Sequence, residues 1–127
     1  MGAGPGARRH PVAHGLQRRL DDASSDFRQA FELAEGAGFP YIGALALAGV
    51  AAVAAVRGDA VEAALVLGRA EELRARMGYE PSPAESALFE DAREGARAAL
   101  GDERLEALLE EGRNRPNERV FPSDRAQ

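Results

Sequence analysis

The sequence predicts an all-α protein in which about five helices pack as antiparallel helix-turn-helix repeats with disordered ends. Alanine supplies much of the 45% hydrophobic content, and such chains favour closely packed helices over a β-sandwich. Apolar residues recur three and four positions apart, whereas alternating runs of β-branched and aromatic residues are missing. Glycine or proline interrupts this pattern repeatedly, which predicts short connections between antiparallel neighbours.

The first expected helix is firm over residues 26–35, where apolar side chains follow a helical period. Two alternatives remain upstream. The helix could run without a break from Leu16, or Ser24 or Ser25 could cap a shorter one. The glycine-rich stretch before Pro40 ends this helix in either case.

The second expected helix, residues 41–57, has no charged residue before Arg57. It is shorter than the roughly 20 apolar residues that a membrane-spanning helix needs, and it is rich in alanine and glycine. A helix that is apolar on all sides is otherwise a buried one. We therefore expect a central core helix and no membrane association.

The third expected helix covers residues 60–77 and carries one apolar stripe. Gly58 ends the helix before it. Asp59 is expected to cap the third helix, with Glu62 completing a pair that resembles a capping box.

The fourth helix has the clearest start signal in the chain. Ser82 stands at the expected N-cap, Pro83 at the first helical position and Glu85 two residues later. Gly101 ends this helix, and Asp102 is expected to cap a short fifth one that ends near Gly112. These helix caps are Asp59, Ser82 and Asp102.

These elements divide the chain into three parts. Residues 1–20 are expected to form a flexible basic arm, residues 21–113 the helical domain and residues 114–127 a flexible tail. His10 and His14 have a spacing that suits a metal on a helix, but Pro11 lies between them and no carboxylate is near. We therefore expect no metal site.

Positions around the turn between the second and third helices have the spacing of small and large residues typical of a helix-turn-helix repeat. They are Leu47, Val50, Ala51, Ala54, Gly58, Asp59, Ala63, Leu67 and Ala70. This spacing resembles a degenerate tetratricopeptide repeat. Ala30 lies about one repeat period before Ala63 and fits a preceding, incomplete repeat.

Residues 65–113 resemble the C-terminal helical region of bacterial LuxR-type regulators and related signal-transduction ATPases. The resemblance rests on the LGRAE run at residues 67–71, on the Pro-x-Pro-x-Glu entry at residues 81–85 and on the ALG run at residues 99–101. It implies an interaction or sensor scaffold, with the chemistry carried by other domains.

The composition argues against several functions. A net charge of −5 disfavours direct nucleic-acid binding. The chain has no cysteine, and because all its basic residues are arginine it lacks the lysine of a phosphate-binding loop. Its carboxylates fall at polar helix positions. We expect no catalytic, cofactor-binding or metal-binding residues and a non-enzymatic, cytoplasmic protein without a signal peptide.

We therefore expect a module that binds a protein or peptide partner; the alternative is a small-molecule sensor with a ligand between helix pairs. Phe27 and Phe31 have no inner-helix partner before them in the sequence. Either an upstream helix covers this face with Leu16 and Leu20, or the face makes a homo-oligomer.

Overall fold

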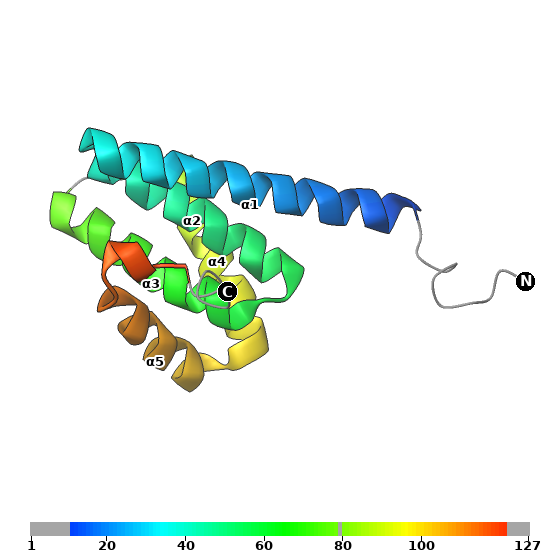
Figure 1. Cartoon of the computed structure of the whole chain (residues 1–127). Helices are drawn as coiled ribbons and strands as arrows, with labels where there is room; N and C mark the ends of the chain where they lie inside the picture. The colour runs from blue at the N-terminus through cyan, green and yellow to red at the C-terminus, as the bar shows by residue number, and fades with distance from the viewer. Residues whose placement is uncertain (1–10, 79, 122–127) are drawn as a thin grey trace, which may run out of the picture.

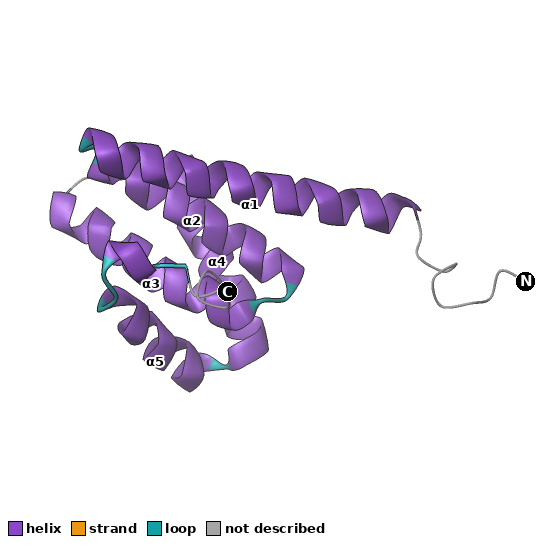
Figure 2. Cartoon of the chain, viewed as in Figure 1, coloured by secondary structure: helices purple, strands orange, loops and turns teal. Residues whose placement is uncertain are grey.

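The computed structural model of the chain describes residues 11–78 and 80–121, and this part is all-helical, as predicted (Figures 1 and 2). It contains five α-helices and one short 3₁₀ helix, and no strand occurs in these ranges. The elements are α1 (Pro11–Ala37), α2 (Pro40–Arg57), α3 (Ala60–Met77), α4 (Pro83–Leu100), α5 (Asp102–Arg113) and η2 (Asn117–Arg119).

Helix α2 lies at the centre of the fold and contacts α1, α3 and α4. Helix α4 packs across both α2 and α3, and α5 packs mainly on α3 (Figure 1). Tight turns join α1 to α2 and α2 to α3, so these neighbours run antiparallel. This packing is compatible with stacked helix pairs.

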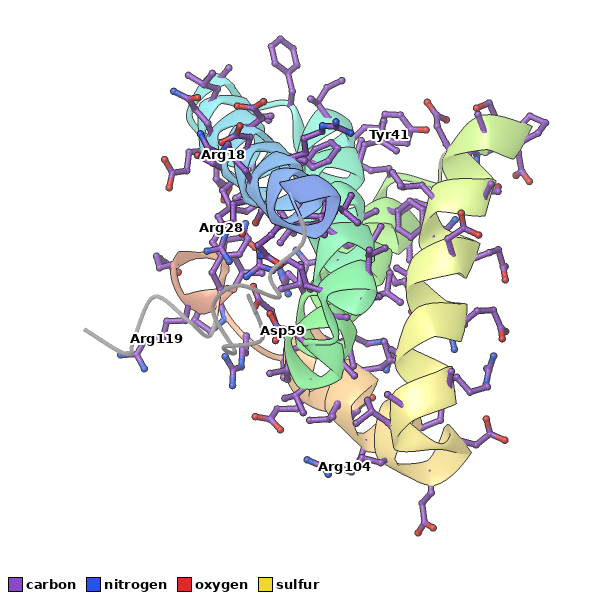
Figure 3. The ribbon with its side chains drawn as sticks, turned by 90° about the vertical axis from the view of Figure 1, so that its right-hand side faces the viewer. Arg18, Arg28, Tyr41, Asp59, Arg104 and Arg119 are labelled. Carbon is purple, nitrogen blue, oxygen red and sulfur yellow. The ribbon has the colours of Figure 1, made fainter. Side chains whose placement is uncertain are left out.

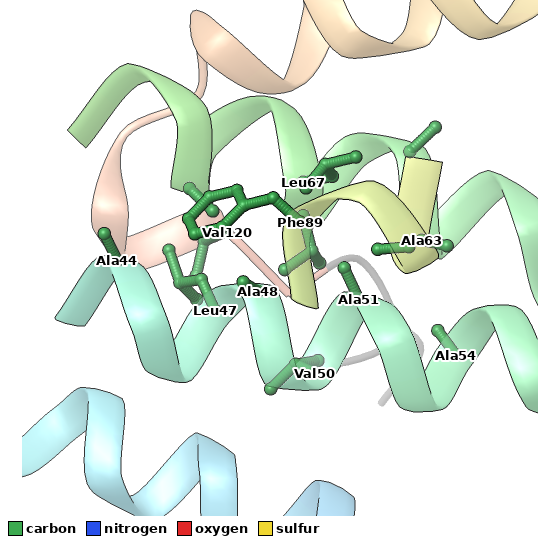
Figure 4. Packing of buried hydrophobic residues seen from close by; sticks show 14 of the residues in the cluster. Ala44, Leu47, Ala48, Val50, Ala51, Ala54, Ala63, Leu67, Phe89 and Val120 are labelled. Carbon is green, nitrogen blue, oxygen red and sulfur yellow. The ribbon is translucent and has the colours of Figure 1, made fainter. Parts of the chain in front are cut away.

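The core lies between α2 and the elements around it (Figure 4). Among the described helices, α2 alone is long and apolar enough to cross a membrane, yet 56% of it is buried inside the protein. Leu47 and Val50 of α2 are at most 1% exposed and pack in the same cluster as Leu67 of α3. The prediction of a core helix is confirmed.

Helix α1 begins earlier than predicted. It starts at Pro11, a residue that the first turn of a helix tolerates because its missing N–H has no acceptor there. Residues 11–20 of the expected flexible arm are therefore helical, and residues 1–10 lie outside the described part. Ser24 is buried inside the helix and accepts a hydrogen bond from Arg28, so neither it nor Ser25 is a cap.

The prediction of a flexible tail over residues 114–127 was wrong for the part that the structure describes, which ends at residue 121. Residues 116–121, which we call the return segment, form η2 and fold back towards α1 and α3. Val120 and Phe121 are 1% and 6% exposed and belong to the main core cluster. Two apolar residues are too few to show a period, so the sequence pattern did not reveal them. Residues 122–127 lie outside the described part.

Only one of the three predicted helix caps forms as expected. Ser82 Oγ accepts the Glu85 N–H at 3.2 Å, and Glu85 accepts the Ser82 N–H at 2.9 Å, which completes a capping box. Asp59 stands at the N-cap of α3 but makes no side-chain cap hydrogen bond. The N-cap of α5 is Gly101, and Asp102 is the first helical residue, whose carboxylate instead accepts a hydrogen bond from Arg97 at 2.7 Å.

This difference predicts unequal effects of two cap substitutions. Ser82→Ala should lower the free energy of unfolding by about 1 kcal/mol, because it leaves a first-turn N–H without its acceptor. Asp59→Ala should cost less than about 0.5 kcal/mol, since it removes only an exposed ion pair with Arg57 at 3.4 Å. Urea denaturation of both variants measures the two values. Equal losses would contradict the assignment of the caps.

Candidate functional site

A hollow lined by charged and aromatic side chains lies where α1, α3 and the return segment meet. It has a volume of about 450 Å³. Charged or polar side chains line it from α1, α3 and the return segment. Two phenylalanines also border it, one from α1 and one from the return segment. The lining residues are Phe31, Glu32, Glu35, Arg69, Asn117, Glu118 and Phe121.

A second hollow of about 270 Å³ adjoins the first. The two share Phe31, Glu35 and Asn117. The second hollow extends towards the turn between α1 and α2, where the Phe39 side chain is 59% exposed, and towards Arg76 near the end of α3. We call the two hollows together the α1–α3 groove.

Arg69 is the unusual residue of the groove, because it carries a charge and is only 7% exposed. Its Nε donates to Asn117 Oδ1 at 2.8 Å, and its Nη1 donates to the Arg113 carbonyl oxygen at 2.8 Å. Both acceptors are neutral, and within the described residues Arg69 forms no ion pair. The second terminal nitrogen, Nη2, makes no hydrogen bond in this part of the chain.

Burial lowers the pKa of the Arg69 guanidinium, and the positive charge of Arg76 lowers it further. The carboxylates of Glu72 and Glu35 act in the opposite direction. An arginine keeps its charge at neutral pH in spite of such a shift. The groove therefore contains a buried positive charge whose nearest hydrogen-bond partners are uncharged, an arrangement that costs stability unless polar groups surround it.

Asn117 links Arg69 to the carboxylate of α1. Its Oδ1 accepts from Arg69, and its Nδ2 donates to Glu35 Oε1 at 3.1 Å. A carboxamide is the side-chain group that accepts on one side and donates on the other, and the amide is oriented here by that pairing. The return segment is thus held between a buried cation and a carboxylate.

Aromatic and cationic groups hold the other end of the return segment. The rings of Phe31 and Phe121 meet edge to face, with centroids 5.7 Å apart. The Arg28 guanidinium lies 4.5 Å over the Phe121 ring and pairs with Glu62 of α3 at 2.7 Å. In Figure 3, Arg28 lies between α1 and the return segment. These contacts tie α1, α3 and the return segment together.

A second polar network joins α3, α4 and α5 on the side of α3 away from α1. Arg93 donates to both oxygens of Glu71, at 3.0 and 2.7 Å, and to Glu106 at 3.3 Å. Burial lowers the pKa of the Arg93 guanidinium, but its hydrogen bonds to Glu71 and the charge of that carboxylate raise it overall. Every charge in this network has a partner of opposite charge, so we interpret the network as one that stabilises the packing of α3, α4 and α5.

The predicted repeat positions are brought together, but in the core and not in the groove. The seven apolar members are 0–3% exposed at the interface of α2 with α3. Gly58 has a φ of +91° in the turn between them, a conformation that favours glycine. Whether these positions are a true repeat remains a hypothesis.

The predicted self-association face is covered within the chain. Phe31 is only 4% exposed and lies against Phe121. Phe27 is half-buried, and its ring lies so close to Gly49 of α2 that a Cβ atom there would approach it to 2.6 Å. Within the chain, the return segment and α2 thus cover Phe31 almost completely and Phe27 in part, and the homo-oligomer through this face stays a prediction.

Sequence reasoning missed Arg69, Glu35, Asn117 and Phe121. One signal was present: Arg69 lies three residues after Val66 and four before Leu73, both of which are buried, so it falls on the apolar stripe of α3. An arginine at such a position indicates a buried charge. No comparable signal marked the return segment.

The described residues contain no group of three or more acidic, histidine or cysteine side chains arranged to hold a metal ion. His10 and the side chain of His14 lie outside the described part of the chain. The titrating group with the clearest environment is Glu85, which belongs to the capping box of α4 and does not line the groove. The hydrogen bond from the Tyr41 hydroxyl is the main cause that lowers the pKa of Glu85, and the Ser82 N–H adds to it.

This lowered pKa predicts an acid-dependent loss of stability. The folded chain binds the Glu85 proton more weakly than the unfolded chain, so the contribution is present above the usual value of 4.5 and disappears as the pH falls through the lowered one. Glu85→Gln removes this titration, so its free energy of unfolding should fall less steeply below pH 4.5 than that of the parent. Urea denaturation at a series of pH values tests this, and parallel curves would contradict it.

Comparisons with known proteins add no relative: no protein-family model, no curated protein and no solved structure matches this chain. The functional argument therefore rests on the geometry of the α1–α3 groove. That groove combines a buried cation, carboxylates and three aromatic rings, and such groups commonly contribute to recognition. The groups needed for a nucleophile with its base do not converge there among the described residues.

Proposed function

We propose that this chain is a non-catalytic helical-repeat module that binds a segment of a partner protein in the α1–α3 groove. The observation that carries the proposal is the buried Arg69 beside two adjoining hollows bordered by Phe31 and by the exposed ring of Phe39. Buried charges and aromatic rings are the groups that most often anchor a partner at an interface. An extended groove also suits a peptide better than an enclosed cavity would.

The sequence resemblance supports a place for this module within bacterial signal transduction. A tetratricopeptide-like scaffold of a LuxR-type transcriptional regulator would bind proteins in the cytoplasm, while other domains carry the chemistry. The net charge of −5 favours a protein partner over direct nucleic-acid contact. The burial of most of α2 supports a role away from the membrane.

The alternative function is a small-molecule sensor, and one observation favours it. The hollow beside Arg69, at about 450 Å³, falls within the usual size range of ligand sites. The uncommitted Nη2 of Arg69 could donate to an acceptor on such a ligand. A rise in melting temperature with a small metabolite, lost in Arg69→Gln, would support this alternative over the peptide one.

A library of random peptides tests the proposed function. Peptides selected on the immobilised full chain are titrated into the ¹⁵N-labelled chain, and the shifts of backbone amides are mapped. We expect them to gather at Phe31, Arg69 and Asn117. Shifts gathered on the outer face of α4, around the exposed Glu90, would contradict the proposal, as would a failure to enrich any peptide.

A further inference from the structure

We propose that the return segment is an intramolecular ligand of the α1–α3 groove and that the partner peptide carries the same two groups. These groups are a side-chain carboxamide and an aromatic ring four residues later, as in Asn117 and Phe121. The inference rests on the proposed function and names the chemistry of its partner. It also makes the return segment a device that closes the groove until a competing peptide displaces it.

Asn117 lies between a cation and a carboxylate. Arg69 can only donate and the Glu35 carboxylate can only accept, so the group between them must accept from one and donate to the other. A carboxylate at this place would attract Arg69 but would be repelled by Glu35 and could not donate to it, and an ammonium group would be repelled by Arg69. A hydroxyl or a neutral imidazole can also accept and donate, but the primary carboxamide of Asn117 is the group that bridges Arg69 and Glu35 here, so we infer that the pair favours a carboxamide.

The carboxamide and the aromatic ring have a fixed spacing in the return segment. Phe121 follows Asn117 by four residues and is held between the Phe31 ring and the Arg28 guanidinium. Between them, Glu118 and Arg119 are exposed, and Figure 3 shows Arg119 pointing away from the helices. Asn117 is half-buried, and Val120 and Phe121 are buried. The carboxamide and the ring supply the specific contacts, Val120 adds apolar burial, and the two exposed positions tolerate other side chains.

The return segment is attached to the groove by side chains. Its backbone hydrogen bonds, among the described residues, stay within the segment: Arg119 N–H to the Pro116 carbonyl at 2.9 Å and Val120 N–H to the Asn117 carbonyl at 3.3 Å. The contacts with α1 and α3 come from side chains. A segment held by side chains alone can leave without breaking a backbone ladder, and a competing peptide can replace its contacts one for one.

The return segment leaves part of the groove open to solvent. Hollows of about 450 and 270 Å³ border Asn117 and are open at the surface. The segment therefore fills the groove incompletely. A peptide with the same carboxamide and ring but larger neighbouring side chains would bury more apolar surface, and this difference would favour displacement.

The test uses the peptide RPNERVF, residues 115–121, with blocked ends and a fluorescent label. The full chain carrying Asn117→Ala and Phe121→Ala has lost the two anchors of its own segment, so we expect it to bind the peptide, measured by fluorescence anisotropy. The unaltered chain should bind at least about ten-fold more weakly, because its own segment competes. Equal binding to both chains, or to neither, would overturn the proposal.

The selectivity of the Arg69 and Glu35 pair is tested by an exchange of groups. A peptide with Asn117→Asp should bind about ten-fold more weakly or worse, because its carboxylate faces Glu35. Adding Glu35→Gln to the chain should restore its binding, since an amide there can donate. An aspartate peptide that binds as well as the parent peptide, or that Glu35→Gln fails to rescue, would overturn the assignment of the carboxamide site.

A measurement on the unaltered chain covers the case in which the double variant fails to fold, as judged by circular dichroism. Excess unlabelled peptide should speed hydrogen exchange at the Val120 amide, because displacement carries this buried residue from the core cluster into solvent. Unchanged exchange at saturating peptide would overturn displacement.

Sedimentation of the chain alone must show a monomer, because a dimer that the peptide dissociates would make a second copy the occupant. Library peptides that bind in the groove without a carboxamide would overturn this inference and leave the proposed function standing.

Discussion

Alanine in place of Gly68 or Gly112 is expected to lower the free energy of unfolding by about 3 kcal/mol or more. Both glycines lie where α3 and α5 contact each other, Gly68 on α3 and Gly112 on α5. A Cβ atom on Gly68 would lie 2.2 Å from the Leu109 carbonyl oxygen, and one on Gly112 would lie 2.0 Å from the Leu65 carbonyl oxygen. Both obstacles are backbone atoms, which no change of side-chain rotamer can move. The two helices must separate to make room, and this uncovers the buried Leu105 and Leu109.

Gly36→Ala is the matched control for this prediction. Gly36 also lies within a helix, α1, but a Cβ atom there would meet nothing within 4 Å. Alanine should therefore raise stability by about 0.5–1 kcal/mol, because it reduces the backbone entropy of the unfolded chain. Urea denaturation of the three variants measures the contrast. Losses below about 1 kcal/mol for both Gly68→Ala and Gly112→Ala would contradict the close contact of α3 with α5.

The glycine pair also shows what sequence patterns leave out. Gly49 of the alanine- and glycine-rich α2 faces the ring of Phe27 and not the backbone of another helix. The tight backbone contact involves α3 and α5, which are separated along the chain by the whole of α4. Periodicity identifies the face that a helix buries, but not which helix covers it. That choice depends on the combined packing of all the elements.

Local chemistry was the most predictable level. The Ser82 capping box involves residues within four positions of one another, so it could be read directly from the sequence. Asp59 and Asp102 had the right residue type, but their carboxylates lie by arginines: Asp59 is 3.4 Å from Arg57, and Asp102 accepts from Arg97. A partner supplied by a neighbouring residue can thus compete with a cap that propensity alone favours.

The candidate site was the least predictable level, because its groups come from distant parts of the chain. Glu35 and Asn117 are 82 positions apart, and Arg69 lies between them in sequence on a third element. Only the arginine on the apolar stripe of α3 carried a local signal. A six-residue stretch such as the return segment contains too few positions for a period, so only the fold reveals that Phe121 covers Phe31.

Leu67→Ala is expected to lower the free energy of unfolding by about 2–5 kcal/mol. Leu67 is fully buried and packs in the core cluster with Leu47 of α2 and Leu105 of α5, so its truncation leaves a cavity where three helices meet (Figure 4). Because α3 also carries Gly68 beside it, the backbone is already in contact with α5 and cannot move closer to fill that space. We therefore expect a value in the upper half of the range.

The same change at Leu33 separates cavity formation from the loss of a leucine as such. Leu33 lies on α1 and is 69% exposed, so Leu33→Ala should alter the free energy of unfolding by less than about 0.5 kcal/mol. Urea denaturation of both variants, with unchanged slopes, measures the difference. If the two losses were similar, the cluster around Leu67 would have to be packed more loosely than its burial indicates. A large loss at Leu67 alone would establish that α2, α3 and α5 share one rigid core, which is the support that the α1–α3 groove requires.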